Sequence, residues 1–422
     1  MIHFLNKHRT IFISVTLALI IFLGLYFRFI YAFEVEFTNQ YRGTEFTQDE
    51  YNYINLVSNL LSDQTYGFSE TPDAQVMPGY PIFLAMIMVI FGTGSAGVFA
   101  VQILQALVST GTIYLVYLLA TKMLNNRGAG LIAATLIAFY SPLILYSRFI
   151  LPETLYIFFI ALYFLIQIKA LEKEESAYHI GAGVLLGVSV LFKPMIFVLL
   201  PLPYIYLFVK NKDHDDRILF VRNFVFFAVA CSVILVPWWI RNIITLERFV
   251  LLSDNAGAFY YGIVRNYDAL PMANSYLGDG MRLLGSELLN RPLETLIWFT
   301  FGKLGVLFVE PAFYLPPDFT LLSGFSGSIH MYIVALGSIG LISGLFINRL
   351  RMMSIFIGAY ILLSLLFIPA SRYGLQYIPF LAIFAVYALF KIMSRTRVII
   401  RRDDNFINSE SGTDPIEKII LE

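Results

Sequence analysis

The chain has 422 residues, of which 58% are hydrophobic and only 14% are charged, and its 29 Lys and Arg balance its 29 Asp and Glu. A soluble domain of this length carries about a quarter charged residues, so this composition indicates a multi-pass membrane protein. The zero net charge gives no sign of a nucleic-acid-binding surface. The single Cys231 excludes a disulfide within the chain and argues against a zinc–thiolate site.

The first hydrophobic run, residues 10–33, follows the basic residues 7–9 and lacks a small-residue cleavage site. This pattern predicts a retained first membrane helix that starts in the cytoplasm. Arg28, near the far end of the run, is expected to extend its guanidinium to the interface between lipid and water. The polar segment 34–75 is then predicted to be extracytoplasmic.

Two adjacent carboxylates, Asp49 and Glu50, lie within this polar segment, and apolar or aromatic residues recur at helical spacing over 53–60. A short amphipathic helix is therefore predicted to start beside the two acids. Asp49 suits the N-cap or the first turn, where a helix favours negative charge, and this structural role is the alternative to a catalytic one. The next apolar run, 80–91, is too short to span a bilayer and is predicted to lie along the membrane surface.

Later hydrophobic runs predict further spans. The stretch 181–208 is interrupted at Lys193 and Pro194 and is divided there into two short spans, with a single kinked helix as the alternative. The sequence predicts an all-α polytopic membrane protein of about ten transmembrane helices, with juxtamembrane helices in two outer segments, 34–95 and 241–330. The predicted spans are residues 10–33, 96–120, 131–150, 154–169, two within 181–208, 224–240, 331–347, 353–369 and 377–392.

The run 293–309 is apolar enough to span, but Lys303 lies in its middle and a span here would invert every later helix. It is predicted to be a surface or re-entrant helix. With this topology Lys and Arg outnumber Asp and Glu in the inner segments, and the reverse holds outside, as the positive-inside rule requires. The transmembrane module covers 1–394, and the tail 395–422 is predicted to be cytoplasmic and disordered.

The charged residues that are hardest to explain fall at the outer membrane face. Charges near hydrocarbon are costly and usually face a cavity or a partner. Carboxylates and cations together at one interface suit a proton-accepting base and a lipid phosphate, whereas structural salt bridges are the alternative for each residue taken alone. The residues are Asp49, Glu50, Arg148, Glu153, Lys193, Arg241, Lys303 and Arg372.

Several motifs follow one another in a familiar order: D-E-Y-N-Y at 49–53, M-P-G-Y-P at 77–81, I-L-P-E-T at 150–154, P-W-W-I-R-N at 237–242, R-F-V-L-L-S-D-N-A-G at 248–257 and S-R-Y-G-L-Q-Y-I-P at 371–379. In order and membrane side they resemble the GT-C membrane glycosyltransferases, in particular the group of protein O-mannosyltransferases and lipid A aminoarabinose transferases. The resemblance covers nearly the whole chain. One departure is the Q-V-M sequence at 75–77, where many relatives carry Arg or Lys.

This resemblance implies an inverting transfer of a sugar from a polyprenyl-phosphate donor to an acceptor hydroxyl at the outer face, without a nucleotide. It implies Asp49 as the catalytic base, with Glu50 and Glu153 orienting the acceptor or the base. Cations would hold the departing phosphate, whose charge grows in the transition state. The cations implied are Arg241, Arg372, Lys303 and Arg148, and the residues implied to line the site are Tyr53, Tyr80 and Asn242.

The sequence predicts no metal site, although the wider fold leaves open a divalent cation held by Asp49, Glu50 and Glu153. The expected partners are a polyprenyl-phosphate-linked sugar, the bilayer, and an acceptor that is a protein, a lipid or a glycan. The expected location is the plasma or inner membrane with both termini cytoplasmic. A lipid or polysaccharide flippase, which would hold its ionisable residues near mid-membrane, and an envelope-assembly scaffold are the competing functions. Convergence of Asp49, Glu153 and Arg241 in space would favour the enzyme.

Overall fold

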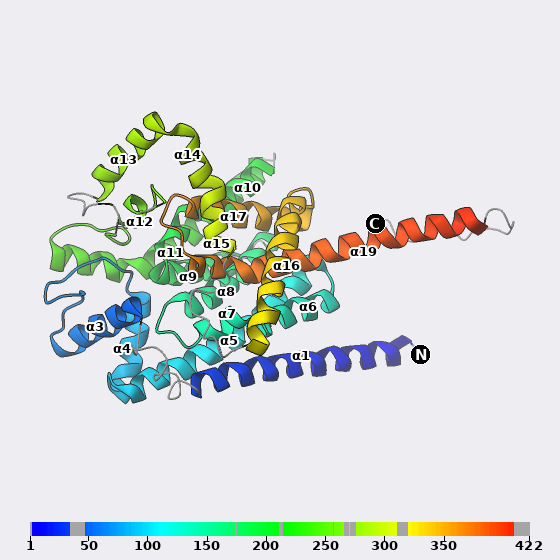
Figure 1. The fold of residues 1–422 in the computed structure, drawn as a ribbon, viewed down its shortest axis with the longest axis horizontal. Helices are drawn as coiled ribbons and strands as arrows, with labels where there is room; N and C mark the ends of the chain where they lie inside the picture. Colours follow the sequence, from blue (N-terminus) through cyan, green and yellow to red (C-terminus); the bar gives the residue numbers. More distant parts are fainter. Residues whose placement is uncertain are drawn as a thin grey trace.

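The structure is a computed structural model that describes residues 2–33, 47–173, 175–210, 214–255, 257–265, 270, 276–309 and 320–408. The described chain is helical and contains no strand (Figure 1). Its first half comprises α1 (Ile2–Phe33), α3 (Gln48–Ser62), α4 (Gly79–Phe91), α5 (Ser95–Leu124), α6 (Arg127–Ala138), α7 (Ser141–Tyr146), α8 (Glu153–Glu172), α9 (Ser176–Phe192), η1 (Pro194–Leu199) and α10 (Leu202–Lys210). Its second half comprises α11 (His214–Leu246), α12 (Gly257–Tyr260), α13 (Tyr276–Asn290), α14 (Pro292–Ile297), η3 (Trp298–Gly302), α15 (Lys303–Phe308), α16 (Thr320–Gly344), α17 (Asn348–Ser364), α18 (Ser371–Gly374), η4 (Leu375–Tyr377) and α19 (Ile378–Asn408).

The predicted class, an all-α multi-pass membrane protein, is confirmed. Within the described residues, five helices are long and apolar enough to cross a bilayer, and Ser328–Gly344 and Asn348–Ser364 form a further pair bent by 119°. Four shorter apolar helices accompany them, namely Gly79–Phe91, Arg127–Ala138, Ser176–Phe192 and Pro194–Lys210. The five long candidates are Thr10–Ile30, Ser95–Leu124, Glu153–Glu172, Arg217–Leu246 and Ser371–Ser394.

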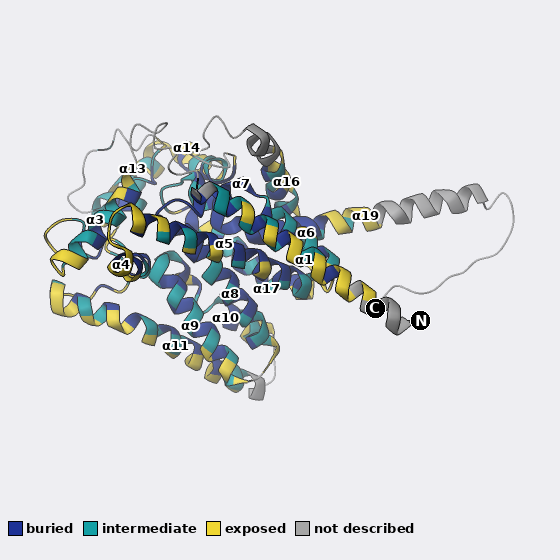
Figure 2. Cartoon of the chain, turned by 90° about the horizontal axis from the view of Figure 1, so that it is seen from below, coloured by how far each residue is buried: buried dark blue, intermediate teal, exposed yellow. Residues whose placement is uncertain are grey.

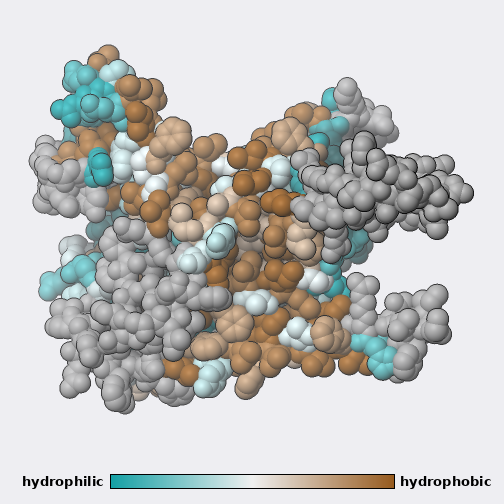
Figure 3. Space-filling model, turned by 45° about the vertical axis from the view of Figure 1, so that its right-hand side comes forward, coloured by the Kyte–Doolittle hydropathy of each residue, from teal (hydrophilic) through white to brown (hydrophobic). Residues whose placement is uncertain are grey.

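The helices α1, α11 and α19 run along the long axis of the molecule (Figure 1). The start of α1 and the end of α19 lie at one end, whereas α3, α12 and α13 lie at the opposite end, which we call the α3 end. The outer surface of α11 carries exposed valines four residues apart, and Figure 2 shows exposed residues along α1 and α11. Hydrophobic residues cover most of the face in Figure 3, with hydrophilic residues towards its edges. A surface of this kind suits contact with lipid.

The predicted span 131–150 is wrong as a single helix. The helix α6 ends at Ala138, and α7 covers only Ser141–Tyr146 with a proline in its first turn. Pro142 has no N–H to donate to the Ala138 carbonyl, and its ring would clash with that carbonyl, so α6 cannot continue past Ala138. The same physics confirms the break predicted at Lys193, where α9 ends and Pro194 opens η1.

The expectation that Arg28 extends to the interface is also wrong. Arg28 is fully buried, and its Nε donates to Ser109 Oγ at 2.7 Å. Its Nη atoms donate to the carbonyls of Gly24, Ile137 and Ala138. The last carbonyls of a helix have no partner within that helix, so the guanidinium satisfies the C-terminal end of α6.

Residues 293–309 and the C-terminal tail differ in part from the sequence prediction. The run 293–309 is helical as expected, but its path passes through a π-helical turn, η3, between α14 and α15. The tail was expected to be disordered from residue 395, yet α19 continues as a helix through Asn408. Residues 395–408 contain neither glycine nor proline, so nothing in them stops a helix that has already begun. The remainder of the tail and residues 34–46 lie outside the described chain.

Candidate active site

Four charged side chains come together at the α3 end, and we call them the charged cluster. Arg372 Nη1 lies 2.6 Å from Asp49 Oδ2. Lys193 Nζ lies 3.1 Å from Glu153 Oε1. The four residues come from α3, the start of α8, the end of α9 and α18. Four segments that are far apart in the sequence therefore place two carboxylates and two cations in one neighbourhood.

The aromatic ring of Tyr373 joins the two ion pairs. Its centroid lies 5.1 Å from Lys193 Nζ and 5.0 Å from Arg372 Cζ. Arg372 Nη2 also donates to the Tyr373 hydroxyl at 3.2 Å, and its guanidinium interacts electrostatically with Glu153 as well as with Asp49. A ring beside two cations attracts both through its negative face, which offsets part of their mutual repulsion.

A capping box fixes the direction of Asp49. The Thr47 hydroxyl accepts from the Glu50 amide at 3.3 Å, and the Thr47 amide donates to Glu50 Oε2 at 2.9 Å. Asp49 therefore lies in the first turn of α3, as one of the two sequence alternatives predicted, and 44% of its side chain is exposed. The positive end of the helix dipole favours an ionised carboxylate at this position.

Glu50 lies beside Asp49 in sequence but has a different environment. Its side chain is buried, and its Oε1 accepts from the backbone amide of Ile150 at 2.9 Å. Both carboxylate oxygens of Glu50 are thus bound by backbone amides. Glu50 ties the start of α3 to the loop that leads into Glu153, so the structure gives it a place behind the charged cluster.

Glu153 is 2% exposed and occupies the first turn of α8. Lys193 binds its Oε1, whereas its Oε2 has no hydrogen-bond partner among the described residues. Buried carboxylate oxygens are almost always hydrogen-bonded in native proteins. The second oxygen of Glu153 can therefore accept a hydrogen bond from a bound ligand.

Both tyrosines implied to line the site interact electrostatically with Glu153, and Tyr53 also interacts with Asp49 and Arg372. Burial raises the pKa of the Tyr53 hydroxyl well above the ordinary value, and the neighbouring Glu153 carboxylate adds to the effect, so the phenol keeps its proton. The Tyr53 ring meets Tyr80 edge to face at 5.0 Å. Tyr80 is buried behind it and donates to Gln105 Oε1 at 2.9 Å.

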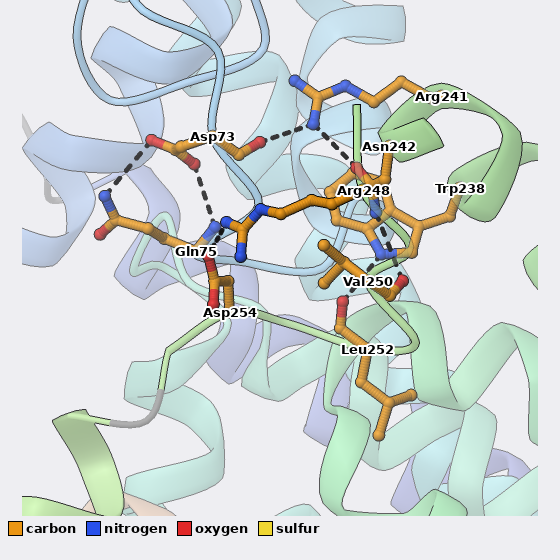
Figure 4. Close-up of polar contacts among 9 residues, drawn as sticks. All are labelled: Asp73, Gln75, Trp238, Arg241, Asn242, Arg248, Val250, Leu252 and Asp254. Atoms are coloured by element: carbon orange, nitrogen blue, oxygen red, sulfur yellow. Dashed lines mark hydrogen bonds and ion pairs between the residues drawn. The ribbon is translucent and has the colours of Figure 1, made fainter. Parts of the chain in front are cut away.

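Arg241 and Asn242 join two loops at the α3 end (Figure 4). Arg241 donates to the carbonyls of Asp73 at 2.6 Å and Tyr66 at 2.7 Å, and to Asn242 Oδ1 at 2.9 Å. Asn242 Nδ2 donates to the Val250 carbonyl at 3.5 Å. These contacts hold the 63–78 loop against the end of α11, and neither residue contacts a member of the charged cluster in the described chain.

Further contacts hold these two loops together, and Figure 4 shows those between Arg248 and Asp254 and between Trp238 and Leu252. Arg248 forms an ion pair with Asp254, and the Asp254 amide donates to the Ala74 carbonyl at 2.8 Å. Trp238 Nε1 donates to the Leu252 carbonyl at 2.9 Å. The convergence test set by the sequence is met for Asp49 and Glu153, whereas Arg241 binds the neighbouring loop.

Lys303 and Arg148, the other two cations implied to hold a phosphate, are both buried. Lys303 Nζ donates to the carbonyls of Leu365 at 2.6 Å and Phe367 at 3.1 Å. Arg148 precedes Glu153 by a short loop, and its carbonyl accepts from Gln102 Nε2 at 3.0 Å. A phosphate-binding role for these two residues, and for Arg241, stays a prediction.

The described residues hold no group of three or more His, Cys, Asp or Glu arranged as metal ligands. Glu50 in particular directs both of its carboxylate oxygens to backbone amides, so the trio considered from the sequence does not assemble. A cleft of about 950 Å³ opens beside α13, α14 and α15. Charged and apolar residues line it, among them Arg265, Glu287, Arg291, Glu294, Trp298 and Phe301.

Comparisons with known proteins agree with this architecture. Residues 72–240, about two fifths of the chain, match the model of a family described as dolichyl-phosphate-mannose-protein mannosyltransferase. The crystal structure of the oligosaccharyltransferase of Archaeoglobus fulgidus, tethered with an acceptor peptide containing the NVT sequon, is similar with a TM-score of 0.56 and 18% identity. The match covers 92% of this chain and 50% of that one. This chain has the GT-C fold, and its residues 72–240 resemble the protein mannosyltransferase family.

A second similar structure is ArnT from Cupriavidus metallidurans bound to undecaprenyl phosphate, with a TM-score of 0.49, 14% identity, and coverage of 91% of this chain and 60% of that one. This GT-C fold protein thus spans about half the length of the oligosaccharyltransferase and less than two thirds of ArnT. No curated protein sequence matches it. The resemblance inferred from the motifs is confirmed at the level of the fold.

Two residues at the charged cluster, Lys193 and Tyr373, were not assigned to the candidate site from the sequence. Lys193 was singled out as a charge at the outer face, and Tyr373 was not singled out at all. Both have a local signal, because Lys193 precedes the proline that breaks the chain and Tyr373 follows Arg372 in the S-R-Y-G motif. The signal says that each lies at a helix boundary, where side chains reach an interface, but it does not say which partner they meet.

Proposed function

We propose that this protein is a membrane glycosyltransferase that transfers a sugar from a polyprenyl-phosphate donor to an acceptor hydroxyl, with inversion at the anomeric carbon. The observation that carries the proposal is the ion pair between Asp49 and Arg372 beside the buried pair of Glu153 and Lys193. A carboxylate that is half exposed and a guanidinium in contact with it are the two groups that this reaction requires. The family match, whose description names a lipid-phosphate sugar, supports the choice of donor.

Asp49 acts as the base in this proposal. The acceptor oxygen attacks the anomeric carbon while its proton moves to the Asp49 carboxylate. The bond between that carbon and the phosphate oxygen breaks, and its electron pair leaves with the lipid phosphate. Attack opposite to the leaving group inverts the configuration. Arg372 and Lys193 stabilise the negative charge that develops on the leaving phosphate.

The ion pair between Asp49 and Arg372 sets the order in which the two substrates bind, with the lipid donor first. A phosphate binds a guanidinium through two parallel hydrogen bonds at least as well as a carboxylate does, so an arriving donor competes with Asp49 for Arg372. Donor binding therefore frees the Asp49 carboxylate from Arg372 to meet the acceptor. Glu153 Oε2, which has no hydrogen-bond partner among the described residues, is placed to accept a hydrogen bond from that acceptor.

The site is assigned to the extracytoplasmic face of the plasma or inner membrane. Excess positive charge in the predicted inner segments supports cytoplasmic termini. The α3 end lies opposite to the start of α1 and the end of α19, so in this proposal it is the extracytoplasmic end (Figure 1). The outer segments 34–95 and 241–330 are then the parts of the chain that meet the acceptor.

The test is the loss of transfer in Asp49→Asn with purified protein. A set of polyprenyl-phosphate sugars is offered with cell-envelope extract as the source of acceptor, and release of polyprenyl phosphate is measured. General-base catalysis contributes roughly a hundredfold to ten-thousandfold, so transfer should fall by at least that lower factor while the protein stays folded. Asp63→Asn is the matched control, because Asp63 is an exposed acid at the other end of the same helix.

Wild-type rates in Asp49→Asn would remove Asp49 as the base. A transporter is the competing function, and it would hold its ionisable groups near mid-membrane, not at the end of the bundle. Movement of the intact lipid-linked sugar across a bilayer by the purified protein, without release of polyprenyl phosphate, would favour the transporter over the enzyme.

A further inference from the structure

The loop that brings Arg372 to Asp49 is held from the outside by a second segment. Residues 365–370 connect α17 to α18, and Arg372 is the second residue of α18. The ammonium of Lys303, on α15, donates to the carbonyls of Leu365 at 2.6 Å and Phe367 at 3.1 Å. Both acceptors belong to this loop, so one side chain fixes two of its backbone positions.

Further contacts also hold the loop 365–370 and the residues just after Arg372. The Ile368 amide donates to the Ala258 carbonyl at 2.7 Å. Gly262 lies so close to the backbone of Phe367 that a Cβ at this position would overlap it, and Gly374 lies equally close to the Leu307 carbonyl. The helix α12 and the turn after it therefore contact the chain before Arg372, and α15 contacts it on both sides of Arg372.

The environment of Lys303 suits a fixed hydrogen-bond donor. Its side chain is fully buried, and its Nζ lies 3.8 Å from the centroid of the Phe299 ring. Burial lowers the pKa of its amine to about 7. The nitrogen keeps at least two N–H groups in either protonation state, and these match the two carbonyls of the loop. Lys303 also lies outside the candidate membrane spans of the described chain.

We propose that Lys303 is a positioning residue that holds the loop 365–370 so that Arg372 meets the phosphate of the lipid donor. This role replaces the direct phosphate contact expected from the sequence, because the carbonyls of Leu365 and Phe367 already engage the Lys303 nitrogen. The inference rests on the proposed role of Arg372 in the transferase reaction. Lys303 touches neither substrate and acts only through the position of Arg372.

The first experiment measures binding of undecaprenyl phosphate to the purified full-length protein. Lys303→Met keeps the length of the side chain and removes its donors, so binding should weaken roughly tenfold to a hundredfold, as misplacement of a binding group by about 1 Å does. Lys303→Gln keeps two N–H donors and should restore part of the affinity. Thr295→Val is the matched control, because the Thr295 hydroxyl bonds only within its own segment, to the carbonyls of Arg291 and Glu287.

A double-variant cycle separates positioning from general destabilisation. If Lys303 acts through Arg372, then adding Lys303→Met to Arg372→Gln should weaken lipid binding no further. A full additional loss in the double variant would overturn the proposal. The same holds if Thr295→Val weakens binding as much as Lys303→Met does.

Hydrogen exchange of the backbone amides tests the positioning without any substrate. Exchange over residues 365–374 should become faster in Lys303→Met and stay unchanged in Thr295→Val. Unchanged exchange in Lys303→Met would overturn the inference. A wild-type protein that binds no lipid phosphate would instead refute the proposed function, while the exchange result would still decide whether Lys303 holds the loop.

Discussion

The buried ion pair between Glu153 and Lys193 gives a quantitative prediction. At the observed separation of 3.1 Å, and with an effective dielectric constant of about 20, the Coulomb attraction is about 5 kcal/mol. Desolvation of the two groups offsets most of this attraction. The Glu153 side chain is 3% exposed and that of Lys193 is 16% exposed, so removal of either partner leaves the other charge without adequate solvation.

Lys193→Met and Glu153→Gln should therefore each lower the free energy of unfolding by about 3–5 kcal/mol, the cost of stranding a buried charge. The double variant should recover most of the stability, because it buries no charge. Thermal and denaturant unfolding of the purified proteins in one detergent, followed by intrinsic fluorescence, would measure the three changes. The double variant should nevertheless transfer no sugar, since it lacks a cation and a carboxylate of the proposed site.

A double variant that is less stable than either single variant would refute this reasoning. Additive losses would mean that the two side chains stabilise the fold independently and that their charges are not coupled across 3.1 Å. Full activity in the stable double variant would leave the pair as a structural element and remove Glu153 and Lys193 from the proposed mechanism.

Three further predictions concern the supports of the site. Arg241→Ala removes charged hydrogen bonds to the 63–78 loop, each worth about 1.5–3 kcal/mol, so proteolysis within that loop should become faster, and an unchanged cleavage rate would contradict the structural role. Gly374→Ala should lower both the unfolding temperature and the affinity for lipid phosphate because its methyl group overlaps the Leu307 carbonyl, whereas Gly285→Ala, inside α13 with open space around it, should lower neither, since alanine favours a helix. Burial lowers the pKa of Lys303 from 10.5 to about 7, so the unfolded chain binds the extra proton and stability should rise as the pH increases between those values; Lys303→Met should lose that slope, and equal slopes would contradict the shift.

Adjacent residues in the D-E-Y-N-Y motif show how far sequence reasoning reached. The pattern correctly predicted a helix that starts beside Asp49 and Glu50. Successive helical residues point in directions about 100° apart, so one carboxylate faces the charged cluster and the other turns into the helix start. Which of the two faces the site depends on the loop around Ile150, whose amide binds Glu50 across the fold.

The cations show the same limit. Sequence and topology placed Arg241, Lys303 and Arg372 at one membrane face, and only Arg372 meets a carboxylate of the charged cluster there. Arg241 and Lys303 bind backbone carbonyls of loops instead. Arg28 does the same within the bundle. Backbone carbonyls are identical at every residue, so no sequence pattern marks the ones that a distant side chain will reach.

The sequence alone determined the features that depend on neighbouring residues. Long apolar runs set the membrane class, prolines set the breaks before η1 and within 131–150, and the order of short motifs indicated the GT-C fold. The tertiary structure alone decided which charges meet, because Asp49, Glu153, Lys193 and Arg372 come from four separate segments. In a poorly solvated interior each cation binds the acceptor that packing places nearest, and that choice is fixed only when the helices assemble.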